Sequence, residues 1–157
     1  MKDKKKTRKR EKQYSKRYVP TSLSRKDADK QKKALQKARS SYKTKRGSKR
    51  YVARPKLKSF TSKKSGWTQK FHELYPEAKT MSQIAKATGI PLKALKAVKK
   101  KGMGAYYSSG SRPNQTAESW GKARMYSYIL GGPTRKVDKH ITDKYHVTFK
   151  HHLKKKV

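Results

Sequence analysis

The sequence predicts a mainly α-helical protein: a small helical domain containing a helix-turn-helix-like unit, preceded by a long extended basic arm. Of 157 residues, 46 are Lys or Arg and 9 are Asp or Glu, a net charge of +37. Hydrophobic residues make up 31% of the chain, which suffices for one small core. Residues 1–66 hold 27 basic and 4 acidic side chains, a net charge of +23. The predicted parts are a basic arm (1–65), a helical domain (66–132) and a basic C-terminal extension (133–157).

The arm is predicted in three pieces. Residues 1–20 are a polycation with too little apolar area to offset the entropy of ordering the backbone. Residues 24–39 favour a helix with Ser24 as N-cap, but its apolar side chains are few, so it is marginal without a partner. Residues 42–65 show no sustained periodicity and indicate an extended linker. We therefore expect the arm to be disordered until a partner neutralises it.

The domain begins with apolar residues at helical spacing, from Trp67 through Phe71 to Tyr75, and Pro76 ends this helix. Residues 80–101 predict two short helices around a tight turn, which Gly89 permits, and Pro91 starts the second helix. The spacing resembles that of a DNA-binding helix-turn-helix.

The outer side of the second helix is predicted to carry lysines that can meet DNA phosphates. Base edges would require Asn, Gln or Arg at these positions, so we expect binding without sequence readout. A packing unit with a solvated lysine face is the alternative, and the sequence leaves both open. The lysines are Lys93, Lys96, Lys99 and Lys100.

Residues 102–132 differ in composition from the lysine-rich background. Gly102 and Gly104 are predicted to mark the exit of a helix. A polar loop follows, and Gln115 or Thr116 opens a second helix, which the Gly-Gly-Pro at 131–133 stops.

Two arginines in this region are candidate phosphate ligands, Arg112 in the polar loop and Arg124 in the helix that follows. Backbone N–H groups and a helix N-terminus beside Arg112 favour an anion. Equally, both arginines can lock the loop by binding its carbonyls, Glu118 or Asp138. The sequence does not decide between these roles.

Aromatic residues interleave with the basic ones, and two uses are open to them. They can stack on nucleic-acid bases, or they can anchor the chain in apolar grooves of partner proteins. For the arm we favour anchoring. The candidate anchors are Tyr14, Tyr18, Tyr42, Tyr51, Trp67, Phe71, Tyr106, Tyr107 and Trp120.

The C-terminal extension alternates apolar and polar residues over 145–150, which favours a short strand or an extended tail. Its histidines fit no strong metal signature, and the chain has no cysteine. Ser108, Asp138 and His140 are not accompanied by a nucleophile motif. We expect no catalytic residue, metal or cofactor, and no membrane span, because no apolar run approaches the required length.

One region carries a family resemblance. The string GMGAYYSSGSRPNQTAESWGKARMYSYILGG is similar to an uncharacterised domain of large double-stranded DNA viruses and some tailed bacteriophages. It covers about half the chain firmly and the arm loosely, and it carries no catalytic activity. The matching residues are Gly102, Gly104, Ala105, Gly110, Arg112, Pro113, Trp120, Ala123, Arg124, Gly131 and Gly132.

The resemblance implies a virus-encoded virion component. With the charge and the arm, it leads to the hypothesis of a non-enzymatic minor capsid protein on the inner capsid face, present in multiple copies. Its arm would thread between viral capsid proteins and contact the packaged double-stranded DNA genome. The expected location is the inner side of the capsid, and the host cell during assembly. The alternative is a nucleoid or genome-packaging protein that binds DNA without sequence preference.

Overall fold

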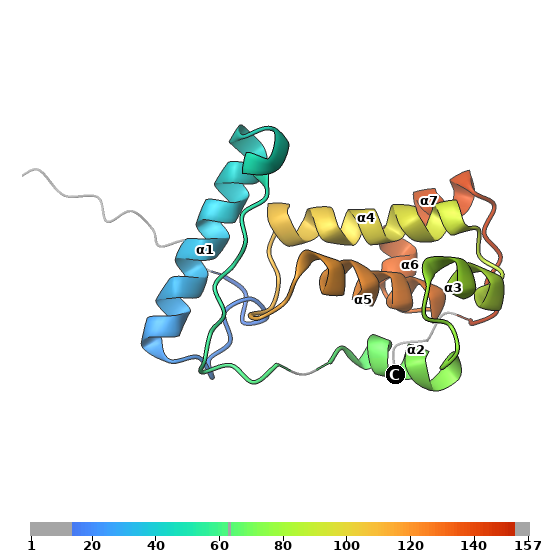
Figure 1. The fold of residues 1–157 in the computed structure, drawn as a ribbon, viewed down its shortest axis with the longest axis horizontal. Coiled ribbons are helices and arrows are strands. Elements are labelled where there is room, and N and C mark those ends of the chain that lie inside the picture. The colour runs from blue at the N-terminus through green and yellow to red at the C-terminus, as the bar shows by residue number, and fades with distance from the viewer. Residues whose placement is uncertain (1–13, 63, 153–157) are drawn as a thin grey trace, which may run out of the picture.

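The computed structural model describes residues 14–62 and 64–152, and within them every regular element is a helix. The mainly-α fold class is confirmed. Two helices, α4 (Leu92–Ser108) and α5 (Ala117–Ile129), lie side by side at the centre, and α1 (Arg25–Thr44) crosses one end of the pair (Figure 1). The shorter elements are η1 (Gly47–Arg50), α2 (Gly66–Leu74), α3 (Met81–Thr88), α6 (Thr134–Val137) and α7 (Lys139–Lys144).

The central pair is packed through two glycines. A Cβ atom on Gly102 would lie 2.8 Å from the Cα of Gly121, and one on Gly121 would lie 2.7 Å from the carbonyl oxygen of Lys99. Both contacts are closer than atoms can approach, so only glycine lets the two backbones meet here. The predicted helix exit at Gly102 and Gly104 is therefore wrong: α4 runs through both to Ser108.

Local capping signals set the predicted helix starts. Thr80 and Thr116 each form a capping box with the residue three positions on. Gly89 takes a left-handed conformation with φ of 70°, and its N–H donates to the carbonyl of Ala85 at 2.9 Å. The predicted two-helix unit of 80–101 is present as α3 and the first part of a longer α4.

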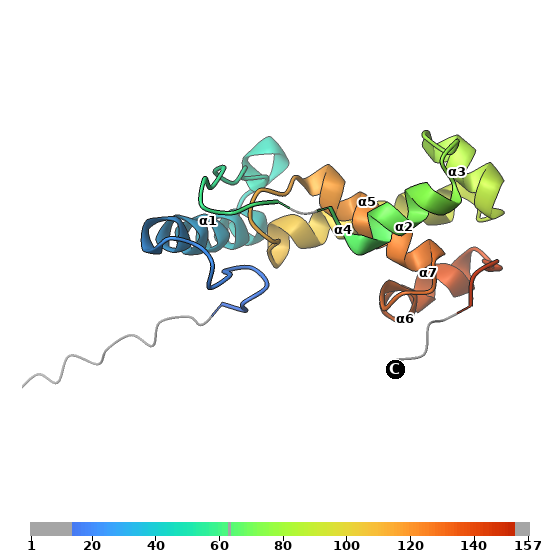
Figure 2. The ribbon, with the colours of Figure 1, turned by 90° about the horizontal axis from the view of Figure 1, so that it is seen from below.

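The core lies where α2, α3 and α7 close over one end of the central pair. The ring of Phe71 stacks on Tyr126, with centroids 4.3 Å apart. Figure 2 shows α3 on one side of the pair and α6 and α7 on the other. Fully buried apolar side chains of this core are Phe71, Ala94, Leu95, Val98, Met125 and Tyr128.

The C-terminal extension forms no strand between residues 133 and 152. Val147 and Phe149 pack against the core from irregular backbone, and Tyr128 meets Phe149 edge-on at 5.1 Å. The short-strand prediction is wrong because alternation marks any half-buried extended segment, whereas a strand also needs a neighbour for its backbone hydrogen bonds. The segment is an irregular packed tail, with a turn at Tyr145 and His146, where His146 has φ of 50°, and a bend after Phe149.

Residues 14–62 pack against the domain. Helix α1 runs from Arg25 to Thr44, longer than predicted, and Ser24 caps it by accepting from the N–H of Asp27 at 3.2 Å. The chain then turns back beside α1 (Figure 1), and Leu35 and Leu57 are buried. These residues therefore do not form an extended arm. A helix with few apolar residues is marginal alone, and here the loop after α4 of the same chain provides its packing partner. Residues 1–13 of the predicted arm lie outside the described residues.

Candidate nucleic-acid interface

One asparagine joins the N-terminal segment to the domain. Asn114 accepts from the N–H of Leu57 at 2.7 Å and donates to the carbonyls of Leu57 at 2.9 Å and Phe60 at 3.1 Å. Asn114 has φ of 60°, a left-handed conformation that asparagine tolerates better than most residues. The Asn114 side-chain amide therefore satisfies backbone hydrogen-bonding groups of residues 57–60, as a neighbouring strand would in a sheet.

The N-terminal end of α1 holds the same returning segment. The carboxylate of Asp27 accepts from the N–H of Ser59 at 3.0 Å and from its hydroxyl at 2.5 Å. These hydrogen bonds, the hydroxyl first, lower the pKa of Asp27. Gln31 is fully buried one turn later and donates to the carbonyls of Tyr18 and Ser111. We call these contacts and those of Asn114 the clasp.

Two arginines of the segment reach the loop after α4. Arg39 donates to the carbonyl of Ser109 at 2.7 Å. Arg54 lies 4.0 Å over the ring of Tyr106, donates to the carbonyl of that residue and donates to the Ser111 hydroxyl at 2.5 Å. Burial lowers the pKa of Arg54. The sequence does not single out either residue, because the arm carries several other arginines and nothing local distinguishes these two.

The structure separates the two arginines that the sequence left undecided. Arg124 forms two hydrogen bonds, of 2.9 and 2.7 Å, with the carboxylate of Asp138, which is fully buried. Arg124 therefore has the structural role that the sequence left open: its guanidinium is occupied by Asp138 within the fold. Arg112 is exposed, and its side chain forms no hydrogen bond or ion pair with any described residue.

Arg135 of α6 binds carbonyls at the C-terminal end of α5, and nothing in the local sequence pattern singles it out. Arg135 is buried, donates to the carbonyls of Tyr128 and Ile129 at 3.2 and 2.9 Å, and donates to His151 at 2.6 Å. Its guanidinium lies 3.6 Å from the ring centroid of Phe149. Arg135 therefore satisfies helix-end carbonyls and holds the C-terminal tail.

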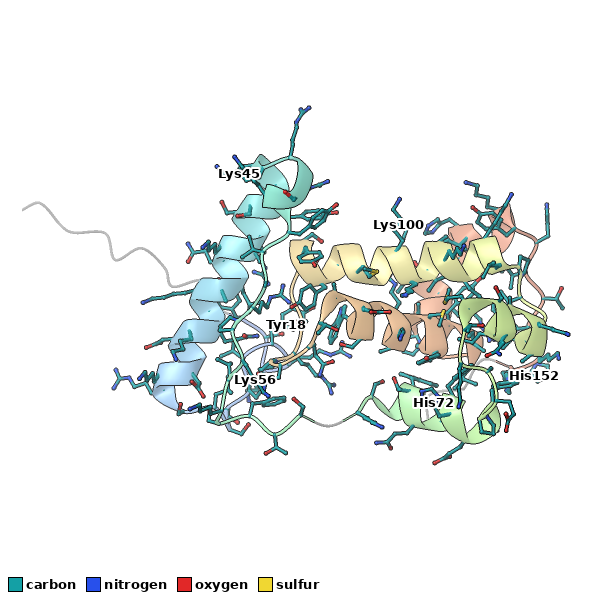
Figure 3. All side chains as sticks on the ribbon, viewed as in Figure 1. Tyr18, Lys45, Lys56, His72, Lys100 and His152 are labelled. Carbon is teal, nitrogen blue, oxygen red and sulfur yellow. The ribbon has the colours of Figure 1, made fainter. Side chains whose placement is uncertain are left out.

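The lysines of α4 form one exposed stripe. Lys93, Lys96 and Lys100 recur every three or four residues and are exposed, whereas Lys99 is partly buried and lies 3.4 Å from Glu118. Figure 3 shows Lys100 pointing away from the central pair. Other faces of α4 pack against α1, α3, α5 and α7, so these lysines lie on a solvent-facing side of the helix that a ligand can reach.

The candidate anchors divide by burial. Phe71 and Tyr106 are buried within the chain, so their assignment as partner anchors is corrected: both rings already fill the protein's own core. Tyr18 meets Trp120 edge-on, with centroids 6.5 Å apart. Tyr14 lies under the guanidinium of Arg39, and Trp67 packs against the core.

The remaining tyrosines gather where η1 meets the end of α4. Tyr51 lies 4.9 Å from Tyr107 and 6.4 Å from Tyr42, centroid to centroid, and Tyr107 lies 4.9 Å from Tyr106. Tyr51 is 52% exposed. The guanidinium of Arg50 lies 3.9 Å over the ring of Tyr42. Beside this cluster is an open pocket of about 420 Å³, formed by the turn between α1 and η1.

Few of the positive charges are paired. Among the described residues, the ion pairs join Glu118 to Lys99 and Lys122, and Asp138 to Arg124. No group of three or more metal-ligating side chains gathers in the described ranges. No helix in them is long and apolar enough to cross a membrane. Most exposed lysines and arginines of the described residues therefore have no carboxylate partner and are available to an anionic ligand.

A family model described as a family of unknown function, DUF5824, matches residues 1–147. The match includes the segment of the clasp, the α3–α4 unit and the loop with Arg112, and it ends before the last residues of the C-terminal extension. No curated protein and no solved structure matches the chain. Since the match spans most of its length, the chain belongs to the DUF5824 family of unknown function.

Proposed function

We propose that this chain is a non-enzymatic structural protein that binds DNA through its phosphates, without reading base sequence. The observation that carries the proposal is the excess of exposed cations without carboxylate partners, in a chain of net charge +37. A polyanion relieves the mutual repulsion of these charges and releases its own counterions on binding.

The α4 stripe supports contact with the backbone of DNA. Lysine is a point charge that meets phosphate in many geometries, whereas base readout relies on the fixed donors and acceptors of Arg, Asn or Gln. Helix α1 adds a second exposed basic surface. Its exposed basic residues are Arg25, Lys26, Lys30, Lys33, Lys37 and Lys43.

The experiment measures salt dependence of binding by the full chain. We expect equal affinity for two unrelated duplexes of about 20 base pairs, and a plot of log Kobs against log salt with a slope near −0.9 per neutralised phosphate. The triple variant Lys93→Gln, Lys96→Gln, Lys100→Gln should lower the slope by up to about 3. Absence of binding at low salt, or a strong preference for one duplex, overturns the proposal.

A matched control separates the stripe from bulk charge. Lys136→Gln, Lys139→Gln and Lys144→Gln remove the same number of exposed charges from α6 and α7. If this variant lowers the slope as much as the α4 variant does, the stripe has no special part in binding.

A second candidate function is the minor capsid protein on the inner capsid face of a large DNA virus. The resemblance of residues 102–132 to viral and phage proteins favours it. Because residues 14–62 are held by the clasp, threading by this segment requires the clasp to open. A density map of intact particles tests this: ordered chain between capsid subunits supports it, and absence from the particle overturns it.

A further inference from the structure

The turn between α1 and η1 concentrates positive charge around an open space. The pocket of about 420 Å³ is lined by Lys43, Lys45, Arg46 and Arg50, and by no carboxylate. Gly47, with φ of 64°, reverses the chain so that cations before and after it face the same space. Its volume falls within the range of about 300 to 1,000 Å³ that small-molecule sites occupy.

Arg50 is preorganised at this pocket. Its Nε donates to the carbonyl of Tyr42 at 2.9 Å, and its plane lies over the Tyr42 ring. Its Nη groups form no hydrogen bond with a described residue. A guanidinium held in this way presents its free donors in a fork that matches a phosphate.

An aromatic face lies beside the cations. The Tyr51 ring lines the pocket, leans on Tyr107 and keeps half of its surface exposed. Exposed aromatic rings next to cations are the means by which proteins hold unpaired bases, since every base has a face that can stack. Paired bases in a duplex are already stacked on each other and do not offer that face.

We propose that this pocket binds one nucleotide of an unpaired DNA strand. The phosphate lies among Lys45, Arg46 and Arg50, and the adjacent base stacks on Tyr51. The proposal rests on the proposed function, which supplies DNA as the partner, and adds a site for strand ends or opened segments. In Figure 3, Lys45 and Lys100 of the α4 stripe both lie toward the upper edge of the view.

The test compares single-stranded with duplex DNA, using the full chain and the variants Tyr51→Leu and Tyr51→Phe. We expect Tyr51→Leu to weaken binding of an oligothymidylate of about 12 nucleotides at least fivefold, the effect of losing about 1 kcal/mol of stacking. Tyr51→Phe keeps the ring and should bind normally. Neither variant should change duplex affinity.

A second readout reports stacking directly. The fluorescence of 2-aminopurine placed in the strand should be quenched on binding the wild-type chain and less quenched by Tyr51→Leu. Thymidine 5′-monophosphate, as competitor, tells whether a free nucleotide fills the pocket as well as a strand does. Competition at low millimolar concentration makes the free nucleotide the ligand and overturns the strand assignment.

The outcomes separate this proposal from the one before it. If the wild-type chain binds neither DNA form, the proposed function fails and this inference fails with it. If duplex binding is normal but Tyr51→Leu changes nothing on the single strand, only this inference is overturned. If Lys45→Gln with Arg46→Gln weakens both forms equally, these cations are part of the general basic surface, and the pocket is not a separate site.

Discussion

The N-terminal segment (14–62) and the domain (64–152) are held by different chemistry. The domain closes on apolar side chains, a glycine-to-glycine helix crossing and one buried ion pair. The segment buries few apolar side chains and is joined to the domain by hydrogen bonds between polar side chains and backbone, at Gln31, Arg39 and Asn114. A stretch with the composition of a disordered polycation can thus be ordered by a loop that supplies the right partners, without a core of its own.

We expect the stability of the domain to depend most strongly on the ion pair between Arg124 and the buried Asp138. Asp138→Asn removes the charge that Arg124 faces, and leaves the guanidinium partly buried without a counter-charge. We expect a loss of about 3 kcal/mol in the free energy of unfolding, measured by urea titration. A midpoint close to that of the wild type would contradict the importance of the pair.

The matched control uses a carboxylate on the surface. Glu118→Gln removes two ion pairs, with Lys99 and Lys122, but the Glu118 side chain is 61% exposed. Solvent and salt screen such pairs, so the urea midpoint should stay near that of the wild type. The contrast between the two variants isolates burial as the cause.

The clasp should open without unfolding the domain. Asn114→Gly keeps the positive φ but removes three hydrogen bonds to residues 57–60. We expect local destabilisation of about 1–3 kcal/mol, seen as faster hydrogen exchange at the Leu57 amide with α5 amides unchanged. Asn114→Asp retains the acceptor for that amide and should speed its exchange less. Equal acceleration in α5 would mean that segment and domain unfold together.

Acid should weaken the other half of the clasp, with a smaller effect. Folding lowers the pKa of Asp27 below its ordinary value of 3.8, chiefly through the Ser59 hydroxyl. The stabilisation is therefore complete above the unfolded pKa and is lost as pH falls through the lower folded pKa. The difference in thermal midpoint between wild type and Asp27→Asn should be present at pH 5 and vanish well below pH 3.8. A difference that persists in acid would contradict this.

The candidate interface was partly predictable from sequence. The lysine spacing in α4 predicts Lys93, Lys96, Lys99 and Lys100 on its outer side, and all but the partly buried Lys99 are exposed, because helical periodicity is local. The pocket at the α1–η1 turn was not foreseen, because the region was interpreted as an extended linker. Its tyrosines come together only when η1 folds back against the end of α4.

Local sequence patterns account for the helical class, the α3–α4 turn at Gly89 and the capped helix start at Thr116. These features depend on residues within about four positions of each other, so the local pattern contains the whole cause. The crossing of Gly102 with Gly121 and the contact of Asn114 with Leu57 emerge only from the folded chain. Those partners lie far apart along the chain, and which groups meet depends on how the entire chain packs.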